Sequence, residues 1–299
     1  MAKAKAKTER LEVLKTYKLY IGGKFPRTES GRFYEPEIGG KKIGNICLAS
    51  RKDVRNSVVA ARAAQAGWAA RTAYNRGQIL YRIGEMLEGR ADQFCSELEL
   101  QGLSAKDAKR EVELSIDRLI YFAGWCDKYQ QIFSSVNPVA SSHFNFSILE
   151  PMGVVFAVVS EDRPLLGLVS LVAPIIASGN SVIVLASQSK PLSAITFGEV
   201  LHTSDVPGGV VNILTGDKNE LVEHFSSHLD VNAIACDGGD AKFRKLLETH
   251  AAGNLKRVKC FEQDWVTDEA ENPYLIQDFC EVKTTWHPIE KISASGAGY

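Results

Sequence analysis

The chain has 299 residues, of which 45% are hydrophobic and 24% are charged, and these values are ordinary for a globular protein. Its 35 basic and 36 acidic side chains give a formal net charge of −1, which provides no overall attraction to nucleic acid or to an anionic membrane. The longest apolar run, Leu165–Ala177, is interrupted by Pro174 and is too short to span a bilayer, so we expect neither a nucleic-acid partner nor a membrane partner.

Residues 1–16 begin with the basic stretch MAKAKAKTER. We interpret them as a solvated, disordered tail, and an arm that binds nucleic acid or membrane is the alternative. No apolar segment follows, so the pattern is not that of a secretory signal. The six cysteines are scattered without a C-x-x-C pair, which predicts no metal site, no disulfide framework and the reduced thiols of a cytoplasmic protein.

Residues 17–135 are predicted to form the helical N-terminal part of a nucleotide-binding-like domain. They open with a strand and a Gly-Gly turn over Tyr17–Phe25. Ser50 and Asp53 then form an S-x-x-D capping box, which is the start signal of a helix. Apolar residues recur at helical spacing in the segments that follow, and they predict three helices, at about 53–70, 76–100 and 104–129.

Residues 136–152 contain an alternating strand pattern over His143–Leu149, which Pro151 interrupts. Short Val/Ile-rich runs then alternate with helical segments over residues 153–264. This order indicates a parallel sheet that is covered on both faces and, with right-handed crossovers, a doubly wound Rossmann-like α/β fold. The five predicted strands are 154–159, 182–185, 210–214, 231–235 and 257–261, and the helices between them are 165–177, 193–201, 220–226 and 241–252.

The last part of the chain changes character twice. Residues 265–276 are acidic and irregular, and we interpret them as a linker. Residues 277–290 contain a further alternating strand, FCEVKTTWHPI, which has no strand partner nearby in the sequence. Val282, Thr284 and Trp286 are expected to share one face of this strand. Residues 291–299 are expected to be a flexible tail.

Several of these segments together resemble the aldehyde dehydrogenase superfamily, over nearly the whole chain. The segments that carry the resemblance are YIGGKF, IDRLIYFAGWCDK, PMGVVFAVVSEDRPLL, APIIASGNSVIVLASQSKPLSA, DVPGGVVNILTGD and NLKRV. The resemblance implies the family's Rossmann-like domain, with a parallel five-stranded sheet, N-terminal helices and a β arm used in oligomerisation.

The resemblance then skips a large part of the family's sequence. CEVKTTWHPI is similar to the family's last strand, which follows the catalytic domain in that family. Here fewer than twenty residues separate Phe261 from the start of this strand at Phe279, and they cannot contain a catalytic domain. The resemblance therefore implies a truncated, pseudoenzyme-like member that is not expected to oxidise aldehydes by itself.

The residues that would carry the family's chemistry are replaced. No cysteine lies in the family's G-Q-x-C setting, and we interpret Cys236 and Cys260 as small buried side chains. The family's oxyanion-binding Asn aligns with Asp162, whose carboxylate cannot donate a hydrogen bond. Its general base aligns with Phe261, and Glu262 lies one place later, on the other face of the strand. Glu161 and Asp162 are expected to form a solvated turn, and a paired acid/base site is the alternative.

The positions aligned with the family's NAD(P) contacts are also altered. Its ribose-binding Lys aligns with Leu185, and the Glu that follows aligns with Gln188. Gly238 and Gly239 still permit close backbone approach before a helix N-terminus, but Asp237 brings a negative charge there unless it serves as that helix's N-cap. The degenerate cofactor-contacting positions are Ser160, Leu185, Gln188, Gly238 and Gly239, so no cofactor is expected, with NAD(P) as the candidate if one binds.

The family's arm survives, and it carries the functional prediction. An alternating strand without a partner must find an edge, so we expect the arm to join this chain to a complete aldehyde dehydrogenase subunit or to a second copy. The oligomerisation residues would be Phe144, Phe146, Ile148, Val282, Thr284 and Trp286. The alternatives are a weak NAD(P)-binding or nucleotide-binding module, an oxidoreductase of changed chemistry that uses Asp162 or Glu262, and a relic without a role.

Overall fold

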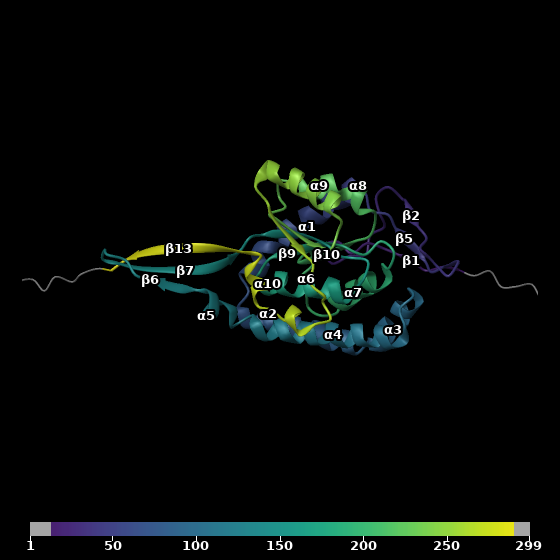
Figure 1. Ribbon diagram of the computed structural model, residues 1–299, viewed down its shortest axis with the longest axis horizontal. Helices are drawn as coiled ribbons and strands as arrows, with labels where there is room; N and C mark the ends of the chain where they lie inside the picture. The colour runs from purple at the N-terminus through teal and green to yellow at the C-terminus, as the bar shows by residue number, and fades with distance from the viewer. Residues whose placement is uncertain (1–12, 290–299) are drawn as a thin grey trace, which may run out of the picture.

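The protein consists of an α/β body from which a narrow β arm extends (Figure 1). The structure, a computed structural model, describes residues 13–289. Residues 1–12 of the predicted basic tail lie outside the described residues, and so does the whole predicted tail 291–299. None of the described helices is both long and apolar enough to cross a membrane.

A five-stranded parallel sheet forms the centre of the body, as the alternation of Val/Ile runs and helices predicted. Its strand order is β10-β9-β8-β11-β12, and every neighbouring pair is parallel. Every residue of the first four strands in this order is buried, and only the edge strand β12 is partly exposed. Such burial is typical of a sheet that is covered on both faces. The strands are β8 (Val154–Val158), β9 (Ser181–Leu185), β10 (Val211–Leu214), β11 (Ala233–Asp237) and β12 (Arg257–Phe261).

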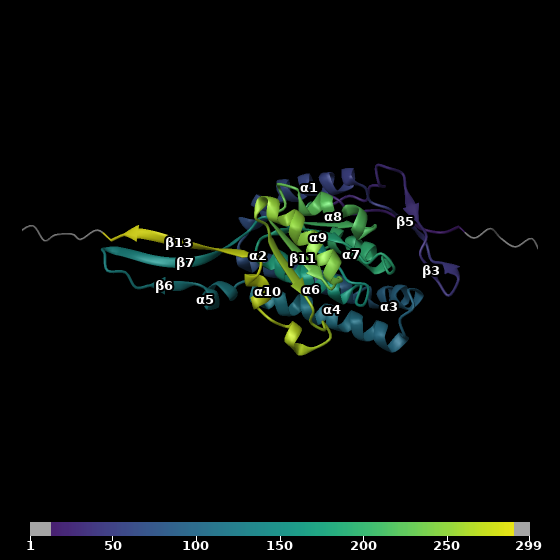
Figure 2. The ribbon, with the colours of Figure 1, turned by 45° about the horizontal axis from the view of Figure 1, so that its top comes forward.

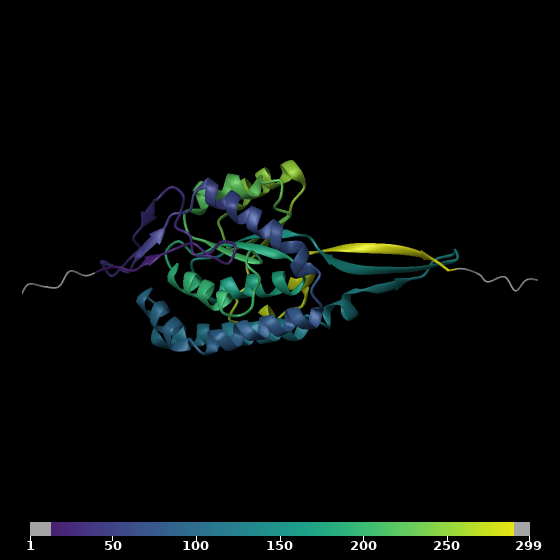
Figure 3. The ribbon, with the colours of Figure 1, turned by 180° about the vertical axis from the view of Figure 1, so that it is seen from behind.

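Helices cover both faces of this sheet (Figure 1). One face carries α1 (Arg51–Ala69), α8 (Lys218–Ser226) and α9 (Ala241–Ala251). The other carries α6 (Leu166–Ala177) and α7 (Leu192–His202). Every residue of α6 is buried, because an outer layer of helices covers it on the side away from the sheet. That layer consists of α2 (Ala73–Glu88), α3 (Ala91–Leu100) and α4 (Ala105–Trp125), and Figure 3 shows it from behind.

The predicted start of α1 is confirmed, but the two predicted helices that follow it differ from the structure. The Asp53 carboxylate accepts the Ser50 N–H at 2.8 Å, which completes the capping box. The single helix predicted over 76–100 is two helices, because α2 ends at its C-cap Gly89, a residue of low helix propensity. The helix predicted over 104–129 ends at Trp125, and α5 (Tyr129–Phe133) follows as a separate turn.

The strand predicted over Tyr17–Phe25 is also much shorter in the structure. Only β1 (Thr16–Tyr17) is regular, and it pairs with β5 (Asn45–Cys47). The Gly-Gly turn is present, with φ of +60° and +76° at Gly22 and Gly23, a conformation that glycine adopts readily. The remaining short strands of this end are β2 (Phe33–Tyr34), β3 (Glu37–Ile38) and β4 (Lys41–Lys42).

Residues 265–276, predicted as a linker, are packed against the body. Trp265, Ala270 and Ile276 are buried in the core, and the Arg118 side chain donates a hydrogen bond to the Trp265 carbonyl at 3.0 Å. The segment forms a short 3₁₀ turn at Asp268–Ala270 and the helix α10 at Tyr274–Gln277. Apolar side chains that lie between the acidic residues of this stretch fill the space beside α4 and α6. The prediction of an exposed linker was therefore wrong.

The arm is a three-stranded antiparallel sheet that projects from one end of the body (Figure 2). Its strands are β6 (Ser135–Asn137), β7 (His143–Pro151) and β13 (Cys280–Pro288), in the order β13-β7-β6. Strand β13, for which the sequence offered no nearby partner, pairs with β7 over its full length, from Cys280 opposite Pro151 to Pro288 opposite His143. The arm thus joins segments that lie far apart in the sequence.

Candidate functional site

The carboxyl ends of β8, β11 and β12 surround a cavity of about 330 Å³. This edge of an open parallel sheet is the usual place for a ligand site. Six positions singled out from the sequence line the cavity: Ser160, Asp162, Asp237, Gly238, Phe261 and Glu262. Arg163, Gln263, Asp264 and Trp265 complete the lining. Leu185, Gln188 and Gly239 lie outside it.

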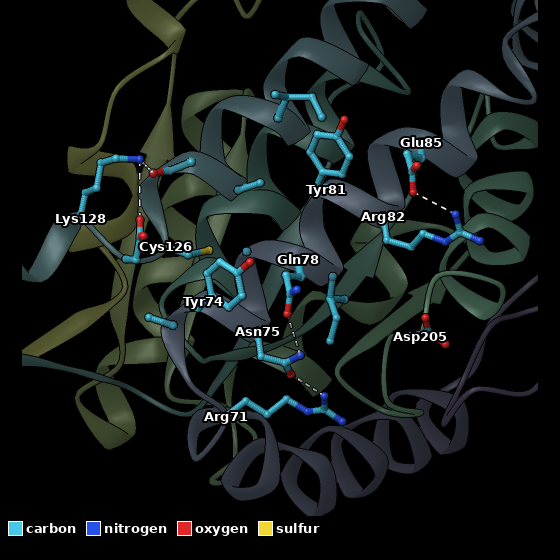
Figure 4. A pocket seen from close by; sticks show the side chains of 17 residues that line it. Arg71, Tyr74, Asn75, Gln78, Tyr81, Arg82, Glu85, Cys126, Lys128 and Asp205 are labelled. Carbon is cyan, nitrogen blue, oxygen red and sulfur yellow. Dashed lines mark hydrogen bonds and ion pairs between the residues drawn. The ribbon is translucent and has the colours of Figure 1, made fainter.

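A larger cavity, of about 720 Å³, lies at the surface between α2 and α4 (Figure 4). Its polar side chains already bind their neighbours, since Arg82 contacts Glu85 at 2.9 Å and Arg71 donates to Asn75 at 2.7 Å. Its charges are of both signs and locally paired, which suits a solvated groove between two helices. We therefore place the candidate site at the sheet edge, where strand ends and buried acids converge.

The first acid at this edge, Glu161, turns away from the cavity and binds the loop after β9. Its carboxylate accepts hydrogen bonds from the backbone N–H groups of Gln188 and Ser189, at 3.0 and 2.9 Å. The hydroxyl groups of Ser187 and Ser189 donate to the same carboxylate. Partial burial opposes ionisation, but these hydrogen bonds outweigh it and lower the pKa of Glu161. Glu161 and Asp162 therefore diverge and do not form a paired acid/base site.

The second acid, Asp237, is buried at the end of β11 with an exposed fraction of 6%. Its carboxylate accepts the Ser160 N–H at 3.3 Å. Burial raises the pKa of Asp237, and the negative charge of Asp162 acts in the same direction. Asp237 does not cap the helix that follows, which was one of the two roles considered for it. Asp240 is the N-cap of α9 and accepts the Phe243 N–H at 2.7 Å.

A third acid, Glu111, reaches this region from α4 and was not identified from the sequence. One oxygen of its carboxylate accepts the backbone N–H groups of Leu165 and Leu166, at 2.9 and 3.2 Å. These groups belong to the start of α6, so Glu111 satisfies donors that a helix N-terminus leaves free. Burial raises the pKa of Glu111. The signal in the sequence is a carboxylate within the buried stripe of a helix that also includes Val112 and Leu119.

The charges at this edge disfavour an anionic ligand. Asp162, Asp237 and Asp264 line the cavity, and Arg163 is the cationic residue of the same lining. Glu262 forms an ion pair with Arg244 of α9 and turns its side chain largely into solvent. Backbone N–H groups of the loop after β9 and of the N-termini of α6 and α9 already donate to Glu161, Glu111 and Asp240. The described residues at this edge therefore offer an anion an acidic lining and few free donors.

Metal ligation finds no support at this edge. Within residues 13–289, no three His, Cys, Asp or Glu side chains are grouped so that they would hold a metal ion.

The arm presents apolar side chains on both of its faces. Phe144 and Phe146 lie on one face, with ring centroids 5.5 Å apart. Val282, Thr284 and Trp286 lie on the other face, opposite Leu149, Ser147 and Asn145 of β7. Val282 and Trp286 are 63% and 58% exposed. Ile148 shares the face of Phe146, and together with β6 these residues border a shallow apolar cavity of about 330 Å³.

Comparison with known proteins agrees with this architecture. A model described as aldehyde dehydrogenase family matches residues 19–263. The mouse cytosolic 10-formyltetrahydrofolate dehydrogenase is 31% identical over 257 residues, which cover 84% of this chain and 28% of that protein. A solved structure of a putative aldehyde dehydrogenase from Burkholderia cenocepacia is 30% identical with a TM-score of 0.78, over 83% of this chain and half of that chain.

A solved aldehyde dehydrogenase from Bacillus cereus, in complex with NAD+, shares the fold at 23% identity with a TM-score of 0.78, over 82% of this chain and 50% of that chain. The chain thus spans half or less of the length of these relatives, and it matches the part that carries their Rossmann-like fold.

Proposed function

Because the chain belongs to the aldehyde dehydrogenase family, we propose that it is a member without aldehyde-oxidising activity of its own. In this proposal it assembles through the arm with a complete aldehyde dehydrogenase or with a second copy of itself. The observation that carries the proposal is the direct connection between the body and the arm. Strand β12 ends at Phe261, and β13 begins at Cys280.

The path of this connection supports the proposal. Residues 262–279 pack against α4 and α6 through Trp265, Ala270 and Ile276. A reacting thiolate needs neighbouring groups that lower the pKa of the thiol, and it must be accessible to the substrate. Cys280, the first residue after this segment, has the opposite properties, because it is buried and burial raises its pKa to about 12.

The acids at the sheet edge support the absence of a bound cofactor in this proposal. A dinucleotide would have to displace the Glu161 carboxylate from the loop after β9 and bring its phosphates close to Asp237. Two like charges about 4 Å apart repel by roughly 1 kcal/mol even in water, and by more when they are partly buried. We therefore expect no thermal shift with NAD or NADP, whereas a ligand at 100 times its Kd would stabilise the fold by about 2.7 kcal/mol.

The arm supports the assembly part of the proposal. Within residues 13–289, both outer strands of its sheet have one unpaired edge, and edges of this kind pair readily with another chain. The exposed apolar residues Phe144, Val282 and Trp286 would be covered by such a partner. A cytoplasmic location is part of the same proposal, and it agrees with the free state of the six cysteines and with the cytosolic description of the mouse relative.

Activity and assembly are tested separately. The purified chain is incubated with a range of aldehydes and NAD or NADP, and no reduced cofactor is expected to form. Turnover that a cysteine-blocking reagent stops would contradict the proposal.

Assembly is measured by light scattering, alone and with a complete aldehyde dehydrogenase. The double variant Val282→Lys/Trp286→Lys should dissociate the assembly. Leu229→Lys, at a site on the body that is 82% exposed, is the matched control and should not change it. A wild-type chain that stays monomeric in both experiments would contradict the assembly.

A further inference from the structure

Two thiols face each other across neighbouring strands of the parallel sheet. Cys236 of β11 and Cys260 of β12 occupy the same register position, so their side chains lie side by side on the same face of the sheet. Neither forms a disulfide in the structure. The residues that follow them, Asp237 and Phe261, line the cavity. The two thiols therefore point to the opposite face of the sheet, toward α9, because side chains alternate along a strand.

The two thiols differ in their surroundings. Cys236 is buried, with an exposed fraction of 1%, whereas Cys260 lies on the edge strand and is half-buried. The Cys236 thiol donates a hydrogen bond to the Gly238 carbonyl at 3.3 Å, and the Cys260 sulfur on the neighbouring strand offers a second acceptor. When Cys260 loses its proton, its sulfur becomes the stronger acceptor because it carries the charge.

The charge on Cys260 has two sources of stabilisation. The hydrogen bond from the Cys236 thiol is the largest, and the Arg244 guanidinium adds to it; both outweigh the effect of burial and lower the pKa of Cys260 to about 7. The same hydrogen bond, together with burial, raises the pKa of Cys236, which keeps its proton. Nearby Glu248 and Glu262 oppose the charge more weakly. A half-buried thiol whose ionisation is favoured thus lies beside a fully buried thiol that keeps its proton.

We propose that Cys236 and Cys260 form a redox-active dithiol, which a hydroperoxide oxidises to an intramolecular disulfide. The Cys260 thiolate attacks one peroxide oxygen, the O–O bond breaks, and a sulfenic acid forms while the other oxygen leaves as water after taking up a proton. The Cys236 sulfur then attacks the Cys260 sulfur. The S–S bond forms, the S–O bond breaks, and the oxygen leaves as water with the Cys236 proton. Two thiols are oxidised, and hydrogen peroxide is reduced to two waters.

Other cysteines of this chain show what a purely structural thiol looks like. Cys126 and Cys280 are buried without a thiol partner, and burial raises the pKa of each to about 12. Cys95 is half-buried like Cys260, but burial and the neighbouring acid Asp92 raise its pKa. Cys95 is therefore the matched control, because its exposure is similar and its thiolate is disfavoured.

The test compares these thiols in the intact chain. With iodoacetamide at pH 7, Cys260 should react about five- to tenfold faster than Cys95, because its much larger thiolate fraction is partly offset by a lower intrinsic nucleophilicity. With one equivalent of hydrogen peroxide, peptide mapping should find Cys236 linked to Cys260, and a thiol reductant should reverse the link. Equal labelling of Cys95 and Cys260, or oxidation of Cys260 without the link, would overturn the proposal.

Two variants separate the two steps. In Cys236→Ser the sulfenic acid at Cys260 should accumulate and be trapped by dimedone, because no resolving thiol remains. In Cys260→Ser the linked peptide should be absent and Cys236 should stay reduced, whereas Cys95→Ser should form the link at the wild-type rate. The labelling experiment on the wild-type chain decides the proposal if a variant fails to fold. Neither readout depends on whether the arm assembles.

Discussion

The central sheet and the arm are both regular β structures, but they bury their residues very differently. Every residue of β8 and β9 is buried between two helical layers. In contrast, almost every residue of β13 beyond Cys280 is exposed, although the strand is paired with β7 over its whole length. Backbone pairing alone therefore does not complete a folded unit. Helices of the same chain bury the apolar side chains of the sheet, whereas the arm leaves apolar side chains and strand edges for a partner to cover.

The same contrast extends to the polar groups. At the sheet edge, Glu161 and Glu111 accept hydrogen bonds from backbone groups of their own chain. In the arm, the acid Glu150 only forms an exposed ion pair with Lys283 at 2.8 Å. The body thus uses its carboxylates internally, and substitutions should be far more costly there than in the arm.

The largest difference is expected for an aromatic residue of the sheet. Phe156 of β8 is fully buried and stacks on Phe225 of α8, with ring centroids 4.0 Å apart. Phe156→Ala should lower the free energy of unfolding by about 3–5 kcal/mol, as measured by urea denaturation. Phe144→Ala, at an arm residue that is 45% exposed, is the matched substitution and should lower the free energy of unfolding by less than about 0.5 kcal/mol. Similar losses of unfolding free energy at the two sites would contradict the difference in burial between the sheet and the arm.

Removal of the buried cap of α6 should have the next largest effect. Glu111→Ala leaves the N–H groups of Leu165 and Leu166 buried without this acceptor, which costs about 1–3 kcal/mol for each unsatisfied group. Glu111→Gln keeps an acceptor oxygen and removes the ionisation. Burial raises the pKa of Glu111, so its contribution is greatest below the ordinary glutamate pKa and is lost as the pH rises through the raised value.

The unfolding free energy of Glu111→Gln should therefore depend less steeply on pH than that of the wild type, from about pH 4.3 upward. Denaturation at several pH values measures this slope. An unchanged slope would show that folding does not raise the pKa of Glu111 and would contradict this assignment.

Glu161 should show the opposite pH dependence. Glu161→Gln weakens the hydrogen bonds from Ser187 and Ser189 and should cost about 1–2 kcal/mol at neutral pH. The pKa of Glu161 is lowered, so its contribution is present above the ordinary glutamate pKa and is lost as the pH falls through the lowered value. The difference between the variant and the wild type should accordingly shrink in acid. A difference that grows in acid would contradict this assignment.

The smallest effect is expected for the ion pair of the arm. Glu150→Ala removes the contact with Lys283, in which both side chains are about half exposed. Exposed pairs of this kind contribute roughly 0–1 kcal/mol and are screened by salt. The melting temperature of Glu150→Ala should hardly differ from that of the wild type, and the difference should shrink further as salt is added. A loss as large as that of Glu111→Ala would show that the arm is stabilised from within.

Much of this fold could be predicted from the sequence. The Val/Ile runs, the capping box at Ser50 and the alternation of β13 depend only on residues close together in the chain, and the predicted parallel strands are present. The same local patterns failed at Gly89, where one predicted helix is divided into α2 and α3, and at Trp265, a core residue whose neighbours in the sequence are largely polar and acidic.

Only the tertiary structure decided how the polar groups and thiols are used. The sequence identified Glu161, Asp237 and Cys260 as positions, but it could not show that Glu161 binds the loop after β9, that Asp240 caps α9 in place of Asp237, or that Cys260 faces Cys236. The physical reason is the separation along the chain between the residues that interact. Side-chain period and turn chemistry act between neighbours in the chain, whereas a hydrogen bond depends on an approach of about 3 Å between groups that the fold brings together from distant positions.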